Sequence, residues 1–531
     1  MMLELIQQME PTTLMAAIII VWIVFLVAIG CAAKRAVTTT GDWLVGGYRI
    51  PVWMVAMWAA GASVSAWAFF GLPGAMYAAG PWQHWTICLP MIPLFVMAVW
   101  LFGRDMRLFA KKYSLMTVPD FLAAAYGESK ALRWAASLGL IVGCLFYSTA
   151  QFKALGVLLG TLFFGSAVGV NYLLGATIGL VVCAIYIIVG GFMAGAIVNT
   201  LNTAMMILAS FLAVGLGYVL TGGFINMYAT IIQKFPTYPM DIGAGLGGMG
   251  WYFALSWIFI SSFGGVAQPH IITKLYGIRR PTSLWWWGLL GSIMFGITCP
   301  AYCYLGSVMK YLTAVGQAPD IMAVYKDPDM TIAYFTVFKI GPMMPALAGL
   351  LIAGVMSAAW STVDGFIMVG GAAISRDILF KCHYPKWTDK QQLAALRGAS
   401  IFVGAMIVLM TYFPPEIVMW LAAIGWQQFS GALAPALCFA VTWKGITKWG
   451  GVASVAGGFI TSTLLTVVFR VPKSILAPLG MGTVGFFKTF YLDSGMWGMI
   501  VGTILLIVVS LATKKERGPV YYEHWKIPQP K

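Results

Sequence analysis

Residues 51–80 read PVWMVAMWAAGASVSAWAFFGLPGAMYAAG, without a single charged side chain. The run is long enough to cross the roughly 30 Å hydrocarbon layer of a membrane as a helix. Glycine and proline interrupt it at 61–65 (GASVS) and 71–74 (GLPG). An interruption frees backbone carbonyls and amides, which are tolerated at membrane depth only where they line a cavity.

A second interrupted segment lies five helices further along the chain. Residues 249–273 contain 261–265 (SSFGG) followed by 268–270 (QPH). Helices broken at corresponding points of two halves indicate inverted repeats with a binding site between them. Small residues that let helices pack closely would explain either segment alone, but the pair favours a site.

Apolar runs of this length recur along the chain, which is 60% hydrophobic and 9% charged, whereas a soluble domain has about 25% charged residues. We therefore predict an all-α polytopic membrane protein with about thirteen transmembrane helices. The paired breaks in the second and seventh of these helices indicate inverted repeats. The helices are expected near 14–33, 51–80, 82–103, 131–164, 171–194, 203–221, 249–273, 283–308, 344–374, 399–413, 416–442, 448–470 and 496–513.

The expected organisation follows from these runs. Residues 1–50 hold an extra N-terminal helix and a loop, and residues 51–221 and 249–442 hold the first and second repeats. Residues 443–513 add two peripheral helices. The tail, 514–531, has no apolar run and is expected to be a short solvated end.

The cationic residues are unevenly distributed. The chain carries 32 Lys and Arg against 17 Asp and Glu, a net charge of +15. Most of the cations fall between alternate pairs of helices, as at Lys34 and Arg35, at 376–397 and in the tail. This pattern is the positive-inside bias rather than a nucleic-acid footprint. It predicts a multi-pass protein of the cell (inner) membrane, in contact with anionic lipid, with the N-terminus outside and the C-terminus in the cytoplasm.

The sequence contains no motif for covalent chemistry. A phosphate loop, a G-x-S-x-G string and an H-E-x-x-H string are all missing, so an ATP-driven pump or a membrane hydrolase has no support. The four His have no metal-ligand spacing. Among the eight Cys, only Cys299 and Cys303 are close in sequence. We interpret them as small buried hydrophobes rather than as a redox or metal pair.

Several short strings resemble the sodium:solute symporter family, which includes carriers of proline, pantothenate, sugars and monocarboxylates. The resemblance covers nearly the whole chain and implies a leucine-transporter fold, with two inverted five-helix repeats, broken second and seventh helices, and peripheral helices. It also implies sodium-driven uptake of a small solute, with no enzyme activity. The strings are 71–74 (GLPG) with Tyr77 and Gly80, 117–122 (TVPDFL), 190–192 (GGF), 268–270 (QPH), 356–364 (MSAAWSTVD) and 428–431 (QFSG) before Pro435.

The resemblance implies a sodium site between the second and ninth helices. By motif, its ligands are the carbonyls of Gly61, Val64 and Ala358 and the hydroxyls of Ser361 and Thr362. Sodium is a hard cation and prefers several oxygen ligands, by the logic that applies to calcium and magnesium. The alternative is that both hydroxyls bond back to carbonyls of their own helix. Sodium is expected as a transported ion, not a permanent cofactor.

The roles of three polar residues at membrane depth are left open. Asp364 makes either a structural polar contact or a contribution to coupling. Asn199 stands where many relatives have a carboxylate. Lys153 is the most isolated cation, and three roles are possible: it snorkels to the interface, meets a substrate carboxylate, or replaces a cation.

The solute pocket is expected between the broken helices. Aromatic walls with a few amides suit a small, partly polar organic molecule, a carboxylate or a zwitterion. The predicted function is sodium-coupled import of such a solute by alternating access. The alternative is a sodium-independent carrier, proton-coupled or an exchanger, that uses Lys153 in place of a cation. The candidate solute-binding residues are Gln83, His84, Tyr147, Gln151, Lys153, Phe263, Trp426 and Gln428.

Overall fold

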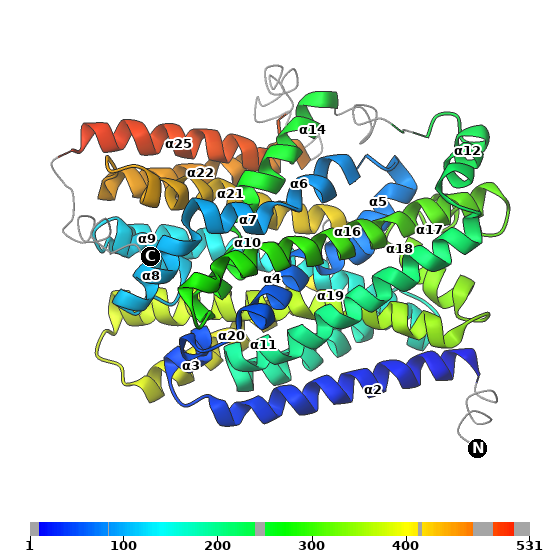
Figure 1. Cartoon of the computed structure of the whole chain (residues 1–531), viewed down its shortest axis with the longest axis horizontal. Helices are drawn as coiled ribbons and strands as arrows, with labels where there is room; N and C mark the ends of the chain where they lie inside the picture. Colours follow the sequence, from blue (N-terminus) through cyan, green and yellow to red (C-terminus); the bar gives the residue numbers. More distant parts are fainter. Residues whose placement is uncertain are drawn as a thin grey trace.

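The computed structural model describes residues 10–82, 84–238, 240, 250–412, 417–470 and 492–514, and these contain helices but no strand. The helices run side by side along the longest axis of the molecule (Figure 1). α2 (Pro11–Ala32) lies along one edge. α22 (Lys448–Arg470) and α25 (Ser494–Ala512) lie along the opposite edge. The predicted all-α class is confirmed.

Most of the long helices follow the expected runs, and shorter helices lie in the segments expected between those runs. The first broken helix comprises α4, η3 and α5, and the second comprises α14, η6, η7 and α15. The bounds are α3 (Thr40–Val45), α4 (Val52–Ala66), η3 (Trp67–Gly71), α5 (Leu72–Ala79), η4 (His84–Cys88), α6 (Leu89–Met91), α7 (Leu94–Ala98), α8 (Arg104–Tyr113), α9 (Val118–Ala125), α10 (Lys130–Phe164), α11 (Val170–Thr221), α12 (Phe224–Lys234), α14 (Gly250–Phe259), η6 (Ile260–Gly264), η7 (Gly265–Ala267), α15 (Pro269–Ile272), η8 (Thr273–Gly277), α16 (Leu284–Ala314), α17 (Ile321–Tyr325), α18 (Met330–Ala333), η10 (Tyr334–Ile340), α19 (Pro345–Ala372), η11 (Ala373–His383), α20 (Asp389–Tyr412) and α21 (Val418–Thr442).

The helix count differs from the sequence estimate. Within the described residues, 10 helices are long and apolar enough to cross a membrane. α11 joins the expected helices 171–194 and 203–221, so the loop expected between them is helical. The chain bends instead at Gly191, whose φ of 52° suits glycine. The multi-span architecture is therefore confirmed, while the count of thirteen remains a prediction.

Both predicted interruptions are present. In the first, the backbone leaves helical geometry at Ser65, the last residue of the predicted 61–65 segment, with φ 56° and ψ 175°. A positive φ is uncommon for a residue other than glycine and marks a strained position held by its surroundings. In the second broken helix, Gln268 is extended between η7 and α15. Both breaks lie among buried residues.

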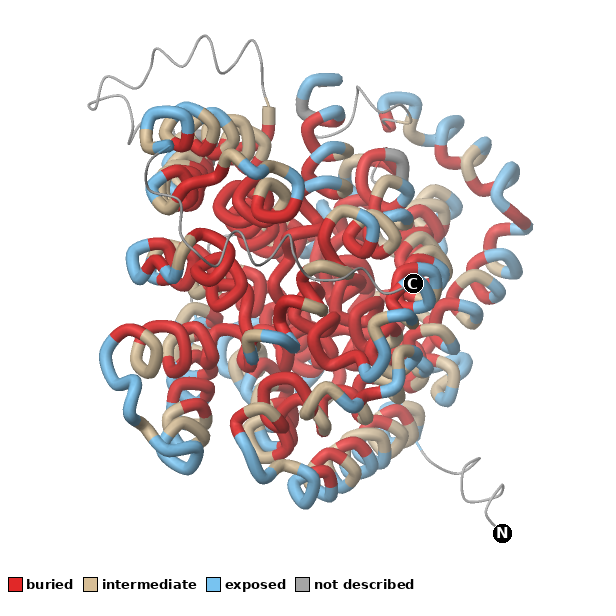
Figure 2. Tube along the Cα trace, turned by 60° about the vertical axis from the view of Figure 1, so that its left-hand side comes forward, coloured by how far each residue is buried: buried red, intermediate tan, exposed pale blue. Residues whose placement is uncertain are grey.

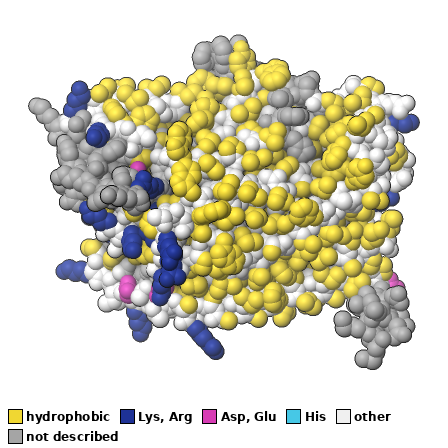
Figure 3. Space-filling model, viewed as in Figure 1, with side chains coloured by type: hydrophobic (Ala, Val, Ile, Leu, Met, Phe, Trp, Pro, Cys, Tyr) yellow, Lys and Arg dark blue, Asp and Glu magenta, His cyan; other side chains and the backbone are white. Residues whose placement is uncertain are grey.

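Burial and charge define the ends of the molecule. The centre is buried on all sides, and exposed residues lie along the periphery (Figure 2). Hydrophobic side chains cover the middle of the visible face, while most visible Lys and Arg side chains gather at the end that carries α3, α8 and α9 (Figures 1 and 3). We call this the basic end and the other the opposite end. An apolar belt of this kind suits a lipid bilayer.

The predicted orientation has a direct test. The C-terminus is expected in the cytoplasm, because Lys and Arg residues next to membrane helices are retained on the cytoplasmic side and the basic end should therefore face it. An alkaline phosphatase fused after Lys531 should be inactive, and a fluorescent protein fused there should fold and emit. Strong phosphatase activity of the fusion would contradict the assignment.

Candidate functional site

Four oxygen atoms converge where α19 faces the first broken helix. The hydroxyl of Thr362 donates to the carbonyl of Ala62 at 2.9 Å and to that of Ala358 at 3.1 Å. The hydroxyl of Ser361 donates to the same Ala358 carbonyl at 3.0 Å. Ser361 and Thr362 are fully buried. Both hydroxyls thus bond back to a carbonyl of their own helix, as the alternative expects. Together with the Ala62 carbonyl they form a cradle of four oxygen atoms, the type of ligand that a hard cation prefers.

The cradle contains most of the expected sodium ligands and one unexpected carbonyl. Gly61 lies beside Ser361, since a Cβ built on Gly61 would stand 3.5 Å from the Ser361 hydroxyl oxygen. The same Cβ would come within 2.4 Å of the Thr203 hydroxyl, so only glycine fits. The Val64 carbonyl accepts from the Trp67 amide. Ala62 was not among the predicted ligands.

A second polar centre lies at the helix break. The amide of Ala66 donates to Gln151 Oε1 at 2.8 Å, and the amide of Trp67 donates to the Ser65 hydroxyl at 3.0 Å. The Tyr147 hydroxyl lies 3.2 Å from that of Ser65. Tyr147 and Gln151, both predicted solute-binding residues on α10, therefore meet at the break. Their spacing of four residues puts them on one face of the helix.

Aromatic rings surround this centre. Trp426 on α21 lies 6.3 Å from Tyr147 and 6.2 Å from Trp67, between ring centroids. His270 from the second broken helix lies 5.7 Å from Tyr147 and 4.1 Å from Phe366. His270 is fully buried. His270 belongs to the 268–270 motif but is not among the predicted site residues. Its position directly after the second break could have indicated that it lies near the site.

Other predicted solute-binding residues lie elsewhere. Phe263 is 43% exposed and stacks on Phe259 at the periphery. Gln428 accepts from Ser462 and Thr463 of α22, and so faces a peripheral helix. Gln83 and the side chain of His84 lie outside the described residues.

Lys153 forms an ion pair that the sequence did not suggest. Its ammonium lies 2.7 Å from the carboxylate of Asp329 and 3.8 Å from that of Asp327. Asp329 is fully buried, and its carboxylate also accepts from the amide of Val418, the first residue of α21. The pair thus joins α10, the loop between α17 and α18, and the start of α21. None of the three roles considered for Lys153 included this partner.

Asp364 lies in a buried polar cluster behind the cradle. Its carboxylate accepts from the side chain of Asn199, from Trp58 Nε1 at 3.4 Å and from the Tyr186 hydroxyl at 3.4 Å. The ammonium of Lys274 lies 4.3 Å from the centre of the Trp58 ring. A carboxylate at position 199 would face Asp364 with the same charge. The neutral amide of Asn199 therefore suits a neighbouring carboxylate at Asp364.

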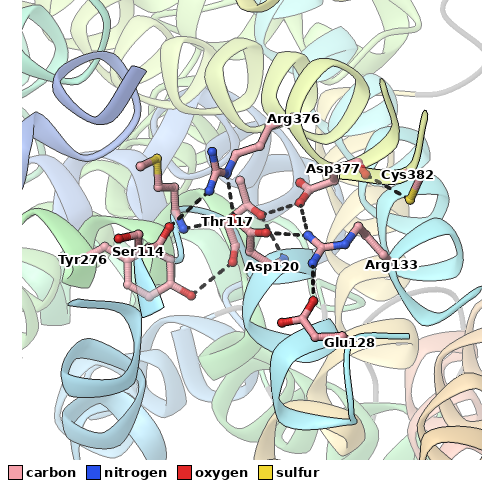
Figure 4. A network of polar contacts seen from close by, with 10 residues as sticks. Ser114, Thr117, Asp120, Glu128, Arg133, Tyr276, Arg376, Asp377 and Cys382 are labelled. Atoms are coloured by element: carbon pink, nitrogen blue, oxygen red, sulfur yellow. Dashed lines mark hydrogen bonds and ion pairs between the residues drawn. The ribbon is translucent and has the colours of Figure 1, made fainter. Parts of the chain in front are cut away.

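A network of buried ion pairs occupies the basic end (Figure 4). Arg133, near the start of α10, binds Asp120 of α9 and, at 3.1 Å, Asp377 of η11. Arg376 binds Asp120 at 2.7 Å. The hydroxyl of Thr117 donates to Asp377 at 2.8 Å. Segments far apart in the sequence are thereby joined through charged groups away from water.

Asp120 is the centre of this network. Burial alone would raise the pKa of its carboxyl, but the guanidinium groups of Arg376 and Arg133 hold that pKa well below its usual range. A group with a lowered pKa contributes stability above its unfolded-state pKa of about 4 and loses it only as the pH falls further. Asp120 therefore stays ionised throughout the neutral range.

The sequence matches the family described as "SSF: Sodium:solute symporter family" over residues 43–458. It is 25% identical to the osmoregulated proline transporter OpuE of Bacillus subtilis (strain 168) over 495 residues, which cover 93% of this chain and 94% of that protein. It is also 25% identical to a sodium/proline symporter of Staphylococcus aureus over 518 residues, covering 96% of this chain and 94% of the relative.

Solved structures share the fold at low sequence identity. A Na⁺-coupled sialic acid symporter superposes with a TM-score of 0.73 at 14% identity, covering 94% of this chain and 98% of that one. MhsT in complex with L-phenylalanine superposes with a TM-score of 0.51 at 11% identity, covering 86% and 98%. These likenesses confirm the multi-span helical fold of the leucine-transporter type.

Proposed function

Because the chain belongs to the sodium:solute symporter family, and is therefore a sodium-coupled solute symporter, we propose that its solute is a small zwitterion or carboxylate and that proline is the first candidate. The two relatives described above are proline carriers by name. Import runs by alternating access between two inverted repeats, with the basic end in the cytoplasm.

The helix break at Ser65 carries this proposal. The amides of Ala66 and Trp67 begin the half-helix that follows the break, and such amides attract negative charge. In this structure they bond to Gln151 and to Ser65 itself. A carboxylate is a stronger acceptor than a neutral amide or hydroxyl. The solute carboxylate takes their place, and the aromatic rings of Tyr147, Trp426 and His270 enclose its apolar part.

Sodium binds in the cradle of Ser361, Thr362 and the nearby carbonyls, on the other side of the same break. The two sites share one broken helix, because Ala62 belongs to the cradle and Ala66 to the solute site. A sodium ion that fixes the first broken helix at Ala62 also fixes the Ala66 amide in the position that binds the solute. Sodium binding therefore favours solute binding, which is the coupling that symport requires. The effect is reciprocal, so solute should also tighten sodium binding.

Uptake into proteoliposomes tests this function. We expect purified protein to accumulate labelled proline, or another small zwitterion or acid from a panel, under an inward sodium gradient. A proton gradient alone, or no gradient, should give little uptake. Uptake that follows the proton gradient and ignores sodium would favour the sodium-independent alternative. Failure to take up any member of the panel would contradict the proposed solute class.

Gln151 distinguishes a carboxylate ligand from other solutes. Gln151→Glu places a negative charge beside the Ala66 amide, to which the solute carboxylate would bind. The two negative charges repel each other, so binding of the acid should be lost. Binding of the corresponding amide should be affected much less, because it lacks that charge. Gln151→Met controls for the loss of the hydrogen bond alone. Equal losses for acid and amide in Gln151→Glu would remove the carboxylate from this position.

The ion pair of Lys153 and Asp329 closes the opposite end. The loop that carries Asp329 packs against the first broken helix, since a Cβ on Gly74 would come within 2.4 Å of the Pro328 carbonyl. Asp329 also binds the Val418 amide at 2.9 Å. The loop therefore contacts α5, α10 and α21 at one point. Lys153 holds this loop in place through its ion pair with Asp329. Its role is therefore to keep the opposite end of the transporter closed rather than to contact the solute.

Lys153→Met should slow uptake and lower stability by about 2 kcal/mol, because Asp329 is left buried without its cation and takes up a proton. The double variant Lys153→Met with Asp329→Asn removes both charges and should recover much of the stability. Asp327→Asn is the matched control, since Asp327 is 3.8 Å away and its side chain is 35% exposed. Thermal unfolding and uptake measure both effects. No recovery in the double variant would contradict the pairing.

A further inference from the structure

Three cysteine side chains meet in the membrane core, at a place that the transport site does not use. Cys299 and Cys303 lie one turn apart on α16, and Cys88 from the end of η4 lies against both. The Sγ atom of Cys299 lies 3.3 Å from that of Cys88, and the Sγ of Cys303 lies 3.7 Å from it. All three residues are fully buried. Because Cys88 is remote in sequence, the sequence alone revealed only a pair.

The three sulfur atoms have the spacing of a trigonal site. They all lie within 4.8 Å of one another. A metal bound at the centre of three sulfurs with bonds of about 2.3 Å would require sulfur–sulfur separations of about 4 Å. The thiols therefore need to move by only fractions of an ångström to share one ion. Within the described residues, the same cluster contains no His, Asp or Glu and no fourth Cys.

The composition of this cluster selects the kind of ion. Thiol sulfur is a soft ligand and favours soft cations such as Cu(I) over sodium, magnesium or calcium. Structural zinc takes four tetrahedral ligands, and three sulfurs leave that set incomplete. We propose that Cys88, Cys299 and Cys303 form a three-sulfur site for a soft monovalent cation of the Cu(I) class. This site is independent of the proposed function.

Charge balance is compatible with the apolar surroundings. A monovalent ion that binds the three thiols and releases one proton leaves a neutral complex, with one thiolate and two thiol ligands. An uncompensated charge at this depth would be costly. Cys303 also lies 3.6 Å from the carbonyl of Ala68, two residues after the half-helix begins at Ala66. A bound ion would therefore tie η4 and α16 to the first broken helix.

Silver(I) is a suitable probe, because it is a soft monovalent cation that does not change oxidation state under these conditions. The full-length reduced protein in nanodiscs is loaded with Ag(I), washed with thiosulfate, and its silver measured by mass spectrometry. We expect the wild type to retain about one ion more than the triple variant Cys88→Ser/Cys299→Ser/Cys303→Ser. Each single variant should retain it at least about tenfold more weakly, because a direct ligand is lost.

The control uses cysteines of equal burial outside the cluster. Cys144 and Cys183 are fully buried, and the double variant Cys144→Ser/Cys183→Ser should retain silver as the wild type does. X-ray absorption on the loaded wild type needs no substitution and should show three sulfurs at one distance. Equal silver retention by the wild type and the triple variant would overturn the proposal. Equal loss in the control variant, or a site with two sulfurs, would also overturn it.

Discussion

Asp120→Asn is expected to lower the free energy of unfolding by about 3–5 kcal/mol, because it removes the shared anion of a buried ion network. Arg376 loses its carboxylate partner and stays buried. Arg133 keeps only Asp377 and the exposed Glu128. Thermal unfolding of the purified protein in detergent measures the loss, which should also reduce the amount of folded protein in the membrane.

Glu128→Gln is the matched control, because Glu128 binds the same Arg133 at 3.3 Å but its side chain is 57% exposed. Exposed ion pairs contribute about 0–1 kcal/mol, so its unfolding temperature should change little. Both variants remove an anion that binds Arg133, but Asp120 is buried and also binds Arg376, so the contrast measures the contribution of a buried, shared carboxylate. A similar small change for Asp120→Asn and Glu128→Gln would show that the network does not stabilise the fold.

Ser361→Ala combined with Thr362→Ala is expected to abolish sodium stimulation of uptake at ordinary sodium concentrations. Hydrogen-bonding groups that contact a charge contribute about 1.5–3 kcal/mol each, so the loss of two hydroxyl ligands should cost about 3 kcal/mol or more. This corresponds to a roughly 100-fold increase in the sodium concentration for half-maximal uptake. Uptake into proteoliposomes at graded sodium concentrations measures the shift.

The alternative explanation for these hydroxyls, bonding back to their own helix, supplies the control. Thr161 is buried on α10 and donates to the carbonyl of Val157 at 2.7 Å. Thr161→Ala removes a hydroxyl of that ordinary kind and should leave the sodium dependence unchanged. If the double variant keeps the sodium dependence of the wild type while folding normally, Ser361 and Thr362 are not ligands.

The sequence predicted features that depend on local composition. Gly, Pro and Ser in 51–80 and 249–273 identified both broken helices, because these residues disturb a helix wherever it packs. The all-α, multi-span class followed from the apolar runs, and the leucine-transporter type followed from the family resemblance. Tyr147 and Gln151, expected as walls of a pocket between the broken helices, contact the break from one face of α10. Their roles as ligands remain predictions.

The features that the sequence missed depend on contacts between distant segments. The partner of Lys153 lies in a loop between α17 and α18, and no local pattern identifies it. Phe263 was expected in the pocket because it belongs to the second broken helix, but its side chain is 43% exposed. It lies in η6, a π-helical turn, and such a turn inserts an extra residue and rotates the following side chains. Local composition does not reveal that turn.

α10 has a mechanical consequence of its own. This single helix carries Arg133 in the basic network, Tyr147 and Gln151 at the break, and Lys153 in the ion pair at the opposite end. Arg133 and Lys153 are about 30 Å apart along its axis. A helix without a kink moves as a rigid body, so a displacement at one end of α10 is transmitted to the other. A substitution that weakens the ion network around Arg133 should therefore be compensated by a second substitution near the Lys153–Asp329 pair, detectable as a long-range second-site suppressor.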